Sequence, residues 1–385
     1  MKIEYDEILI RYGEIFLKSE MVRRIYEKKL VKNIKNFLKK DGVKFEIYRK
    51  RGRIFIKTKE ILKSSKILKK IFGIVSFSPC IHLKTSKKED IINFFKQNFS
   101  QFIKPGETFS LKVKRVGKHT YSSQQLAREA GKVIKRKVNL SIPDVKIFIE
   151  VREDDTYIYK KIVKGLGGMP VSTSGKVLAL ISGGIDSPVA SWFAMKRGCK
   201  VVFIHFHSFP LLSKASIEKT KELIKILSEY QGKSRIYFIP FAEIQMKIKT
   251  LAPIKYRIVL YRRAMVKISE EIAKRENAKA LVTGESLAQV SSQTLENLAV
   301  INEAASTPIL RPLIGMDKNE IIKIAKKIKT YEISIKPQED CCTLFVPKHP
   351  TTKAKLEVIK KLEKKIEIEK LIDKATKEAE VVEVD

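Results

Sequence analysis

Cysteine is scarce in this sequence: there are four in 385 residues, and no two of them form a Cys-x-x-Cys pair. So few thiols exclude a disulfide framework, and their spacing offers no zinc site. Long apolar runs are also absent, since none approaches the ~18 residues of a membrane-spanning helix, and the start MKIEYDEILI is acidic and strand-like, unlike a signal peptide. We therefore expect a cytoplasmic protein without membrane attachment, in which cysteine matters for its reactivity.

Acidic residues are few relative to basic ones. Lys and Arg number 78 against 43 Asp and Glu, which gives a formal net charge of +35. Heat adaptation enriches Lys and Glu together, so an excess of Lys and Arg alone points to a polyanionic partner, nucleic acid rather than an anionic membrane. Hydrophobic residues make up 44% of the chain and charged residues 31%, a mixture typical of folded proteins. The length predicts two or three domains.

Two α+β regions are predicted before residue 166. Residues 1–60 read as strand, amphipathic helix and hairpin, and residues 61–165 as further helices and strands. Each region carries a basic cluster, which is either solvated surface, or support for a helix C-terminus, or a set of phosphate contacts. The candidate nucleic-acid contacts are Arg49, Lys50, Arg51 and Arg53 in the hairpin, Lys112, Lys114 and Arg115 on the strand TFSLKVKRV, and Lys132, Lys135 and Arg136 toward the end of a helix expected over residues 122–138.

A Gly/Ser/Thr-rich stretch, residues 166–175, is the clearest linker in the chain. In residues 176–385 continuous apolar strands such as VLALIS, VVFIHF and RIYFIP alternate with helical stretches. This pattern predicts an α/β domain with a parallel sheet covered on both faces. The tail from about residue 352 has helical spacing and mixed charge, which predicts a surface helix without a chemical role.

The loop SGGIDS follows the first of these strands and precedes a helix, with Ser187 expected to cap it and Pro188 in the first turn. Gly183 and Gly184 let backbone N–H groups converge on an anion, and the hydroxyls of Ser182 and Ser187 add donors, so the loop predicts a phosphate site. Asp186 would repel a bare phosphate, and it makes sense as a ligand of Mg²⁺ bridging the phosphate oxygens. The alternative is an ordinary turn that needs glycine for its geometry.

Two other nucleotide motifs are missing. There is no GxxxxGK[ST] loop, and GLGG near residue 165 precedes a strand where a dinucleotide fingerprint would follow one. The sequence therefore disfavours kinase-like and dehydrogenase functions.

The segment SGGIDSPVA resembles the PP-loop of ATP pyrophosphatases. Together with GMPVSTSGKVLAL, HFHSFP, TGESLAQVSSQTLEN, RPLIGMDKNEI and EDCC, it makes the whole chain similar to the tRNA 4-thiouridine sulfurtransferase family. The resemblance implies a ferredoxin-like domain over residues 1–60, a THUMP RNA-binding domain over 61–165 and a PP-loop domain over 176–385. It also implies that ATP adenylates O4 of uridine 8 in tRNA and that a cysteine persulfide then replaces the activated oxygen.

The resemblance further implies roles for single residues. Lys318 would help to activate the target uridine, although it also follows Asp317 in an expected capping box. Cys342 would carry the persulfide, with Cys341 or the more distant Cys199 as candidate helpers. Several residues to which the resemblance gives a role also have a structural alternative. His205 can be a core histidine, Arg262 a surface cation, Gln293 a loop residue and the Cys341–Cys342 pair buried apolar side chains. The implied ATP contacts are Leu180, Ile181, Ser182, Gly183, Gly184, Asp186, Ser187, His205, Phe206, Arg262, Gly284 and Gln293.

The implied partners are tRNA, held by its acceptor end and elbow, a cysteine desulfurase or other sulfur donor, and a second copy of the chain in a homodimer. No stretch resembles the rhodanese-like domain of some family members, so the route of sulfur and any part in thiazole synthesis stay open. Three alternatives remain: another AMP-forming RNA modifier, such as a 2-thiolating or lysidine-forming enzyme, a THUMP-containing methyltransferase, and a non-catalytic tRNA-binding protein. An intact SGGIDS loop argues against the last two.

Overall fold

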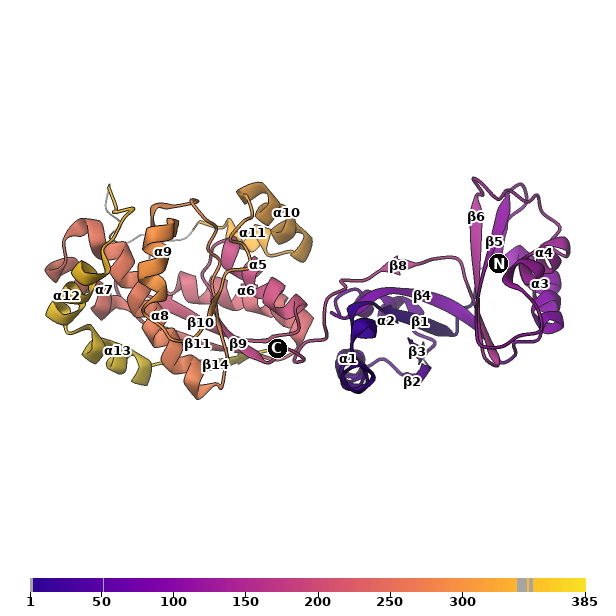
Figure 1. Ribbon diagram of the computed structural model, residues 1–385, viewed down its shortest axis with the longest axis horizontal. Coiled ribbons are helices and arrows are strands. Elements are labelled where there is room, and N and C mark those ends of the chain that lie inside the picture. The colour runs from indigo at the N-terminus through magenta and orange to yellow at the C-terminus, as the bar shows by residue number, and fades with distance from the viewer. Residues whose placement is uncertain (1–2, 51, 338–344, 346–348) are drawn as a thin grey trace. The chain divides into compact units, whose positions relative to one another are not determined.

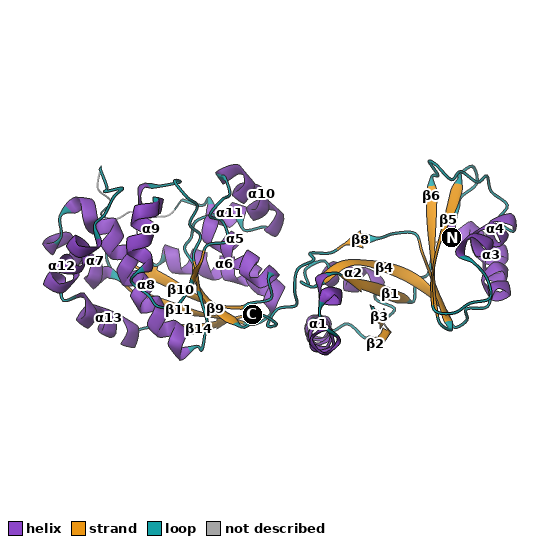
Figure 2. Ribbon diagram, in the orientation of Figure 1, coloured by secondary structure: helices purple, strands orange, loops and turns teal. Residues whose placement is uncertain are grey.

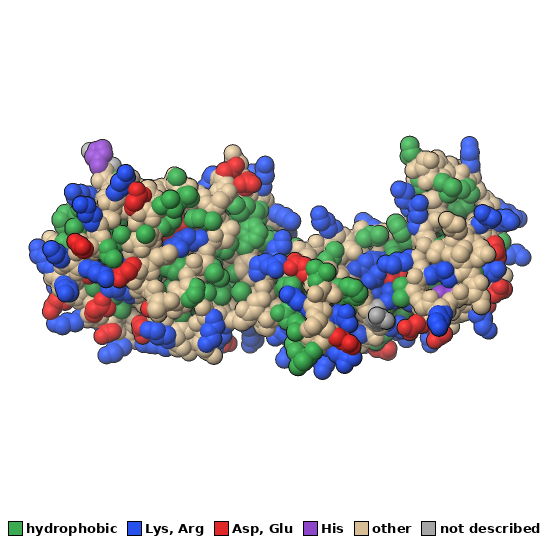
Figure 3. All heavy atoms as spheres, viewed as in Figure 1, with side chains coloured by type: hydrophobic (Ala, Val, Ile, Leu, Met, Phe, Trp, Pro, Cys, Tyr) green, Lys and Arg blue, Asp and Glu red, His purple; other side chains and the backbone are tan. Residues whose placement is uncertain are grey.

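The computed structural model describes residues 3–50, 52–337, 345 and 349–385. It contains two compact units, Met1–Met169 and Pro170–Asp385 (Figure 1). Among the described residues, no helix is long and apolar enough to span a membrane. Figure 3 shows Lys and Arg side chains on both units, as the charge excess predicts.

The first part of unit 1 is a four-stranded arrangement in the order β2-β3-β1-β4, with helices packed on it. Alternate side chains of β1 and β3, such as Ile8, Ile10, Ile54 and Ile56, are buried against Leu30, Ile34 and Leu38 of α1. The predicted hairpin is confirmed. The elements are β1 (Glu7–Tyr12), η1 (Glu14–Leu17), α1 (Glu20–Lys40), β2 (Glu46–Lys50), β3 (Arg53–Lys57), α2 (Ile61–Leu68) and β4 (Ile74–Leu83).

The second part of unit 1 continues the same sheet in the order β4-β7-β6-β5, and β8 pairs with β4. β5 and β6 are parallel, and β5 lies at the sheet edge. A separate core contains Ile91, Phe95, Leu126 and Ile147. The elements are α3 (Lys88–Phe102), β5 (Phe109–Val116), α4 (Ser123–Lys132), β6 (Val145–Arg152), β7 (Asp155–Tyr159) and β8 (Val163–Lys164).

The helix expected over residues 122–138 ends early, at Lys132. Beyond it the backbone turns to pair with β5, because the N–H of Phe109 donates to the carbonyl of Lys137 at 3.0 Å and the N–H of Asn139 donates to the carbonyl of Phe109 at 2.9 Å. Lys135 and Arg136 therefore lie in a loop and not on a helix.

Unit 2 is built on a sheet in the order β13-β12-β9-β10-β11-β14, parallel except for β14 (Figure 2). Val202 and Ile204 of β10 belong to one core with α7 and α8, while Val201 and Phe203 are buried on the opposite face, so helices cover both faces as predicted. The strands are β9 (Lys176–Leu180), β10 (Lys200–His207), β11 (Ser234–Pro240), β12 (Leu281–Val282), β13 (Ile309–Leu310) and β14 (Glu380–Val384). The longer helices are α5 (Asp186–Lys196), α6 (Ala215–Gln231), α7 (Ala242–Leu251), α8 (Arg257–Arg275), α9 (Leu295–Asn302) and α10 (Lys318–Ile328), followed by the single turn α11 (Tyr331–Ser334).

The prediction of a single surface helix for the tail is wrong. The tail forms α12 (Leu356–Ile366) and α13 (Ile368–Lys377), separated at Glu367, where φ is 56°, and then β14, which pairs antiparallel with β11. Ile359, Ile366 and Ile372 are buried in the main core of unit 2, so the tail packs against the domain instead of lying on it.

Candidate functional site

The SGGIDS loop connects β9 to α5 and is held together by its two serines. The N–H of Ser182 donates to Oγ of Ser187 at 2.9 Å, and the two hydroxyl oxygens lie 3.2 Å apart. The expectation that Ser187 caps the helix is wrong, because α5 begins at Asp186 after Ile185, and the side chain of Ile185 makes no capping hydrogen bond. Ser187 lies within the first turn, from which its hydroxyl folds back to brace the loop.

Asp186 is the acidic group of this loop, and two side chains from distant parts of the chain bind its carboxylate. Nζ of Lys318 lies 2.6 Å from Oδ1, and Nε2 of Gln289 donates to Oδ2 at 2.9 Å. Lys318 is the first residue of α10, whose capping box of Asp317 and Glu320 forms as predicted. A cation in the first turn opposes the helix dipole, and its contact with Asp186 gives the lysine a partner that offsets this cost.

Gly284 follows β12 and lies against the start of α5. A Cβ atom at this position would lie 2.8 Å from the backbone nitrogen of Ser187 and 2.9 Å from the carbonyl carbon of Asp186. Real Cβ atoms do not approach backbone that closely, so only glycine lets the two segments meet.

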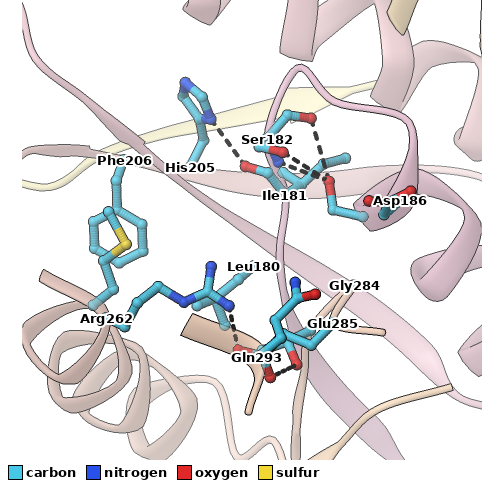
Figure 4. A pocket seen from close by; sticks show the side chains of 13 residues that line it. Leu180, Ile181, Ser182, Asp186, His205, Phe206, Arg262, Gly284, Glu285 and Gln293 are labelled. Atoms are coloured by element: carbon cyan, nitrogen blue, oxygen red, sulfur yellow. Dashed lines mark hydrogen bonds and ion pairs between the residues drawn. The ribbon is translucent and has the colours of Figure 1, made fainter. Parts of the chain in front are cut away.

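A pocket of about 160 Å³ opens at the carboxyl ends of β9, β10 and β12 (Figure 4). Ligands bind at this edge in open α/β sheets. The structure brings together every expected ATP contact except Gly183 and Gly184, which do not line the pocket; Met265, Thr283 and Glu285 also line it and were not anticipated. The lining residues are Leu180, Ile181, Ser182, Asp186, Ser187, His205, Phe206, Arg262, Met265, Thr283, Gly284, Glu285 and Gln293.

His205 is buried, and its ring supports the backbone next to the loop. Nδ1 lies 2.9 Å from the carbonyl oxygen of Ile181, and Nε2 lies 3.3 Å from Oγ of Ser216 on α6. These are the contacts of a structural histidine that fixes the end of β9.

Glu285 forms the most deeply buried charged group of the pocket, with only 2% of its surface exposed. Its Oε1 accepts from the guanidinium of Arg262 on α8, and its Oε2 accepts from Nε of Arg311 at 2.5 Å and from the hydroxyl of Thr283 at 2.9 Å. Burial alone would raise the pKa of Glu285, but the charges of Arg262 and Arg311 outweigh burial and hold this pKa below its usual value. The carboxylate therefore stays ionised.

Gln293 lines the same pocket and has an unused hydrogen-bond acceptor. The residue is 8% exposed, and its Oε1 is buried without a hydrogen-bond partner among the described residues. Buried amide oxygens are rarely left unpaired, which is a sign that a ligand completes this site.

The expected nucleic-acid contacts in the hairpin of unit 1 are mostly engaged within the protein. Lys50 pairs with Asp155, Arg53 is 15% exposed and lies 3.0 Å from Glu150, and Arg49 is 3.6 Å from Glu27. Arg53 is therefore an internal cation in this structure. Arg51 lies outside the described residues.

The other basic candidates divide into exposed and packed residues. Lys112 and Lys114 are exposed on one face of β5, and Lys132 and Lys135 are also exposed. Arg115 lies over the ring of Tyr121 and Arg136 over that of Phe99, at 5.6 Å and 5.1 Å from the ring centroids. The four exposed lysines keep their charge available to a partner.

The cysteines expected to carry sulfur, Cys341 and Cys342, lie outside the described residues. Cys199, considered as a distant helper, is buried next to the carbonyl of Ser174. Burial raises the pKa of the Cys199 thiol, which disfavours the reactive thiolate at neutral pH.

Comparison with known proteins decides the family. The model described as thiamine biosynthesis protein (ThiI) matches residues 172–368, and those for the ThiI ferredoxin-like domain and the THUMP domain match residues 7–78 and 86–160. The chain belongs to the thiamine biosynthesis protein (ThiI) family. A ThiI relative from Caldanaerobacter subterraneus subsp. tengcongensis, described as a probable tRNA sulfurtransferase, is 44% identical over 98% of this chain and 100% of its own length. One from Acetivibrio thermocellus with the same description is 44% identical over 98% of each chain.

Solved structures agree with the ThiI assignment. A crystal structure of a 4-thiouridine synthetase in complex with RNA and bound ATP superimposes with a TM-score of 0.89 at 35% identity, covering 99% of this chain and 100% of that one. A protein from Pyrococcus horikoshii, at 22% identity and a TM-score of 0.64 over 84% of this chain, shares the fold.

Proposed function

We propose that this chain is an ATP-dependent tRNA sulfurtransferase that converts uridine 8 of tRNA to 4-thiouridine. The observation that carries the proposal is the convergence of the loop serines, Asp186, Arg262, Gly284 and Gln293 on one pocket at the carboxyl edge of the sheet. The full-length relatives described as tRNA sulfurtransferases, and the similar 4-thiouridine synthetase with ATP and RNA, support it.

ATP is the proposed occupant of this pocket. The free Oε1 of Gln293 can accept from the exocyclic amino group of adenine, and the guanidinium of Arg262 supplies positive charge for the phosphates. The Ser182–Ser187 loop and the start of α5 provide the donors for an anion.

Mg²⁺ fits this site as an ion coordinated jointly by the protein and the nucleotide, and not as one held by protein side chains alone. The described residues contain no group of three or more His, Cys, Asp or Glu side chains able to hold a metal ion by themselves. Asp186 is the carboxylate that the loop presents, and oxygens of the nucleotide and water would supply the remaining ligands. Bound there, the ion would neutralise phosphate charge.

The proposed reaction has two steps, adenylation and sulfur transfer, and the second ends with cleavage of a sulfur–sulfur bond. O4 of the uridine attacks the α-phosphorus of ATP, the bond from that phosphorus to the bridging oxygen breaks, and pyrophosphate leaves. The terminal sulfur of a persulfide on Cys342 then bonds to C4, the C4–O4 bond breaks and AMP leaves with the oxygen. A second thiol, for which Cys341 is the nearest candidate in the sequence, cleaves the sulfur–sulfur bond and leaves a disulfide that an external thiol reduces.

Unit 1 is the proposed tRNA-binding part. The ferredoxin-like and THUMP matches lie in this unit, and we propose residues 1–60 and 61–165 as the two domains. The unit exposes Lys112, Lys114, Lys132 and Lys135. Sulfur would come from a cysteine desulfurase or an equivalent persulfide donor, and the proposed assembly is a homodimer.

The direct test uses unmodified tRNA, ATP, Mg²⁺ and a persulfide donor, followed by nucleoside analysis. We expect 4-thiouridine at position 8 and one AMP per product. Formation of 2-thiouridine, or of lysidine in a parallel reaction supplied with lysine, would favour another AMP-forming RNA modifier. Absence of both pyrophosphate release and thiolation would contradict the proposal.

Two variants separate the two steps. Asp186→Ala should lose pyrophosphate release while it keeps its affinity for tRNA. Cys342→Ser should keep pyrophosphate release, because adenylation needs no thiol, and lose 4-thiouridine formation. Thiolation retained by Cys342→Ser and lost by Cys341→Ser would move the sulfur-carrying role by one residue.

A further inference from the structure

Glu285 is a carboxylate beside the proposed site of a polyanion. By Coulomb attraction and repulsion alone, a negative group lining this pocket would weaken the binding of ATP. The carboxylate is also 2% exposed, and burying an ionised group is costly unless partners compensate. Its presence therefore calls for a function that outweighs both effects.

The contacts of Glu285 connect three segments of unit 2. Arg262 comes from α8, Arg311 from the end of β13 and Thr283 from the strand end just before Glu285 itself. Arg311 is held in turn by Asn302 on α9, whose Oδ1 accepts from its Nη2 at 2.8 Å. Because Gly284 packs on the backbone of Asp186 and Ser187, the carboxylate has a fixed place relative to the phosphate loop.

The cluster of Glu285, Arg262 and Arg311 has positive charge that can attract an anionic ligand. Two guanidinium groups share one carboxylate, so the cluster carries an excess positive charge. Of the two arginines, Arg262 lines the pocket, whereas Arg311 does not. An unsupported arginine would lose much side-chain entropy on binding a phosphate, and an anchored guanidinium has already lost it.

We propose that Glu285 is a positioning residue that holds the guanidinium of Arg262 in the orientation that binds ATP, with Arg311 as the second support of the same carboxylate. This inference rests on the proposed function, since it takes ATP as the ligand. It adds a residue that touches neither the reacting atoms nor the phosphates but determines how strongly the nucleotide is held.

The neighbouring residue of α8 provides a matched control. Arg263 is 1% exposed, and its Nε and Nη2 donate to the carboxylate of Glu363 at 2.8 Å and 3.1 Å, away from the pocket. Glu285→Gln and Glu363→Gln therefore each remove the charge of a buried carboxylate from an arginine of the same helix. Both should lower the melting temperature, but only Glu285→Gln should change ATP binding.

The experiment is titration of the full-length protein with ATP and Mg²⁺ well below the melting temperature of each variant. Removing one partner of a charge pair across a binding interface typically weakens binding by roughly thirtyfold or more. Because Glu285 acts on ATP only through Arg262, a smaller loss, roughly tenfold, follows from its removal. We expect a loss of that size in Glu285→Gln and a change below about twofold in Glu363→Gln. Unchanged or tighter ATP binding in Glu285→Gln would overturn the proposal, because tighter binding is what simple charge repulsion predicts.

A double-mutant cycle tests whether the effect acts through Arg262. In an Arg262→Ala background, Glu285→Gln should weaken ATP binding no further, since the group that it positions is gone. Additive losses would overturn the positioning role. If Glu285→Gln does not fold, Arg262→Lys serves instead: it keeps the charge but cannot form the planar pairing, and unchanged affinity in it would overturn the proposal. Failure of the wild-type protein to bind ATP would refute the proposed function itself.

Discussion

At the scale of single residues, Gly284 is required by close approach and not by flexibility. Its missing side chain lets the end of β12 touch the backbone of Asp186 and Ser187. Gly284→Ala should lower the free energy of unfolding by about 1–3 kcal/mol, a typical cost of overpacking, and should weaken ATP binding because the phosphate loop must move. Thermal unfolding and ATP titration check this.

Gly315→Ala is the control for Gly284→Ala. A Cβ atom at Gly315 would meet no heavy atom of the described residues within 4 Å, and Gly315 belongs to the same unit. Its stability and ATP affinity should stay close to those of the wild type. Equal effects of the two substitutions would refute the close-approach argument.

His207, at the end of β10, makes stability depend on pH. Burial, with smaller contributions from His205 and Lys214, lowers the pKa of His207 from 6.5 to about 4. Between these values the unfolded chain binds a proton that the folded protein does not. This contribution to stability is therefore complete above pH 6.5 and is lost as the pH falls toward 4.

His207→Gln should thus lose less stability than the wild type when the pH falls from 7.5 to 5. Melting temperatures at the two pH values measure the difference. His349→Gln is the control, because His349 is exposed. If wild type and His207→Gln show the same pH dependence, His207 does not contribute in this way.

At the scale of elements, the sequence predicted those that have a strong period or a strong end signal. β9, β10 and β11 are continuous apolar runs between helices, and α10 starts at a capping box that the structure contains. β14 escaped prediction because its side chains are half exposed or exposed at the sheet edge, so no apolar run marks it. The early end of α4 also escaped, because pairing with β5 overrides local helical spacing.

In the candidate site, too, some features could be predicted from the sequence and others could not. Ser182, Asp186 and Ser187 line the pocket as expected, because serine and aspartate lie within a few positions of each other on one loop, whereas Gly183 and Gly184 do not line it. The partners of Glu285 were not predictable, since Arg262 and Arg311 lie on other elements and only the folded chain brings them to one carboxylate. Neither the composition nor the residue spacing of the sequence predicts such a contact.

At the scale of the whole molecule, the net positive charge bears most on tRNA binding: the chain has 78 Lys and Arg residues against 43 Asp and Glu. Each compact unit has its own core, and unit 1 places Lys112 and Lys114 on the exposed face of its edge strand β5. β6 pairs with one side of β5, and on the other side the described residues pair with the strand only at its first residue, Phe109, so the part that carries Lys112 and Lys114 is open to a partner. This makes unit 1, residues 1–169, a fragment that can be tested alone.

The fragment should bind tRNA, and its binding constant should fall steeply with salt as condensed counterions are released from the phosphates. Replacing Lys112 and Lys114 together with alanine should reduce the slope of log K against log salt by about 1–2. The control replaces Lys32 and Lys35, two exposed lysines of α1 in the same unit, and should leave the slope unchanged. An equal reduction of the slope by both pairs would mean that net charge alone, and not the β5 face, attracts the RNA. Binding of tRNA confined to residues 170–385 would show that unit 1 is not part of the RNA-binding surface.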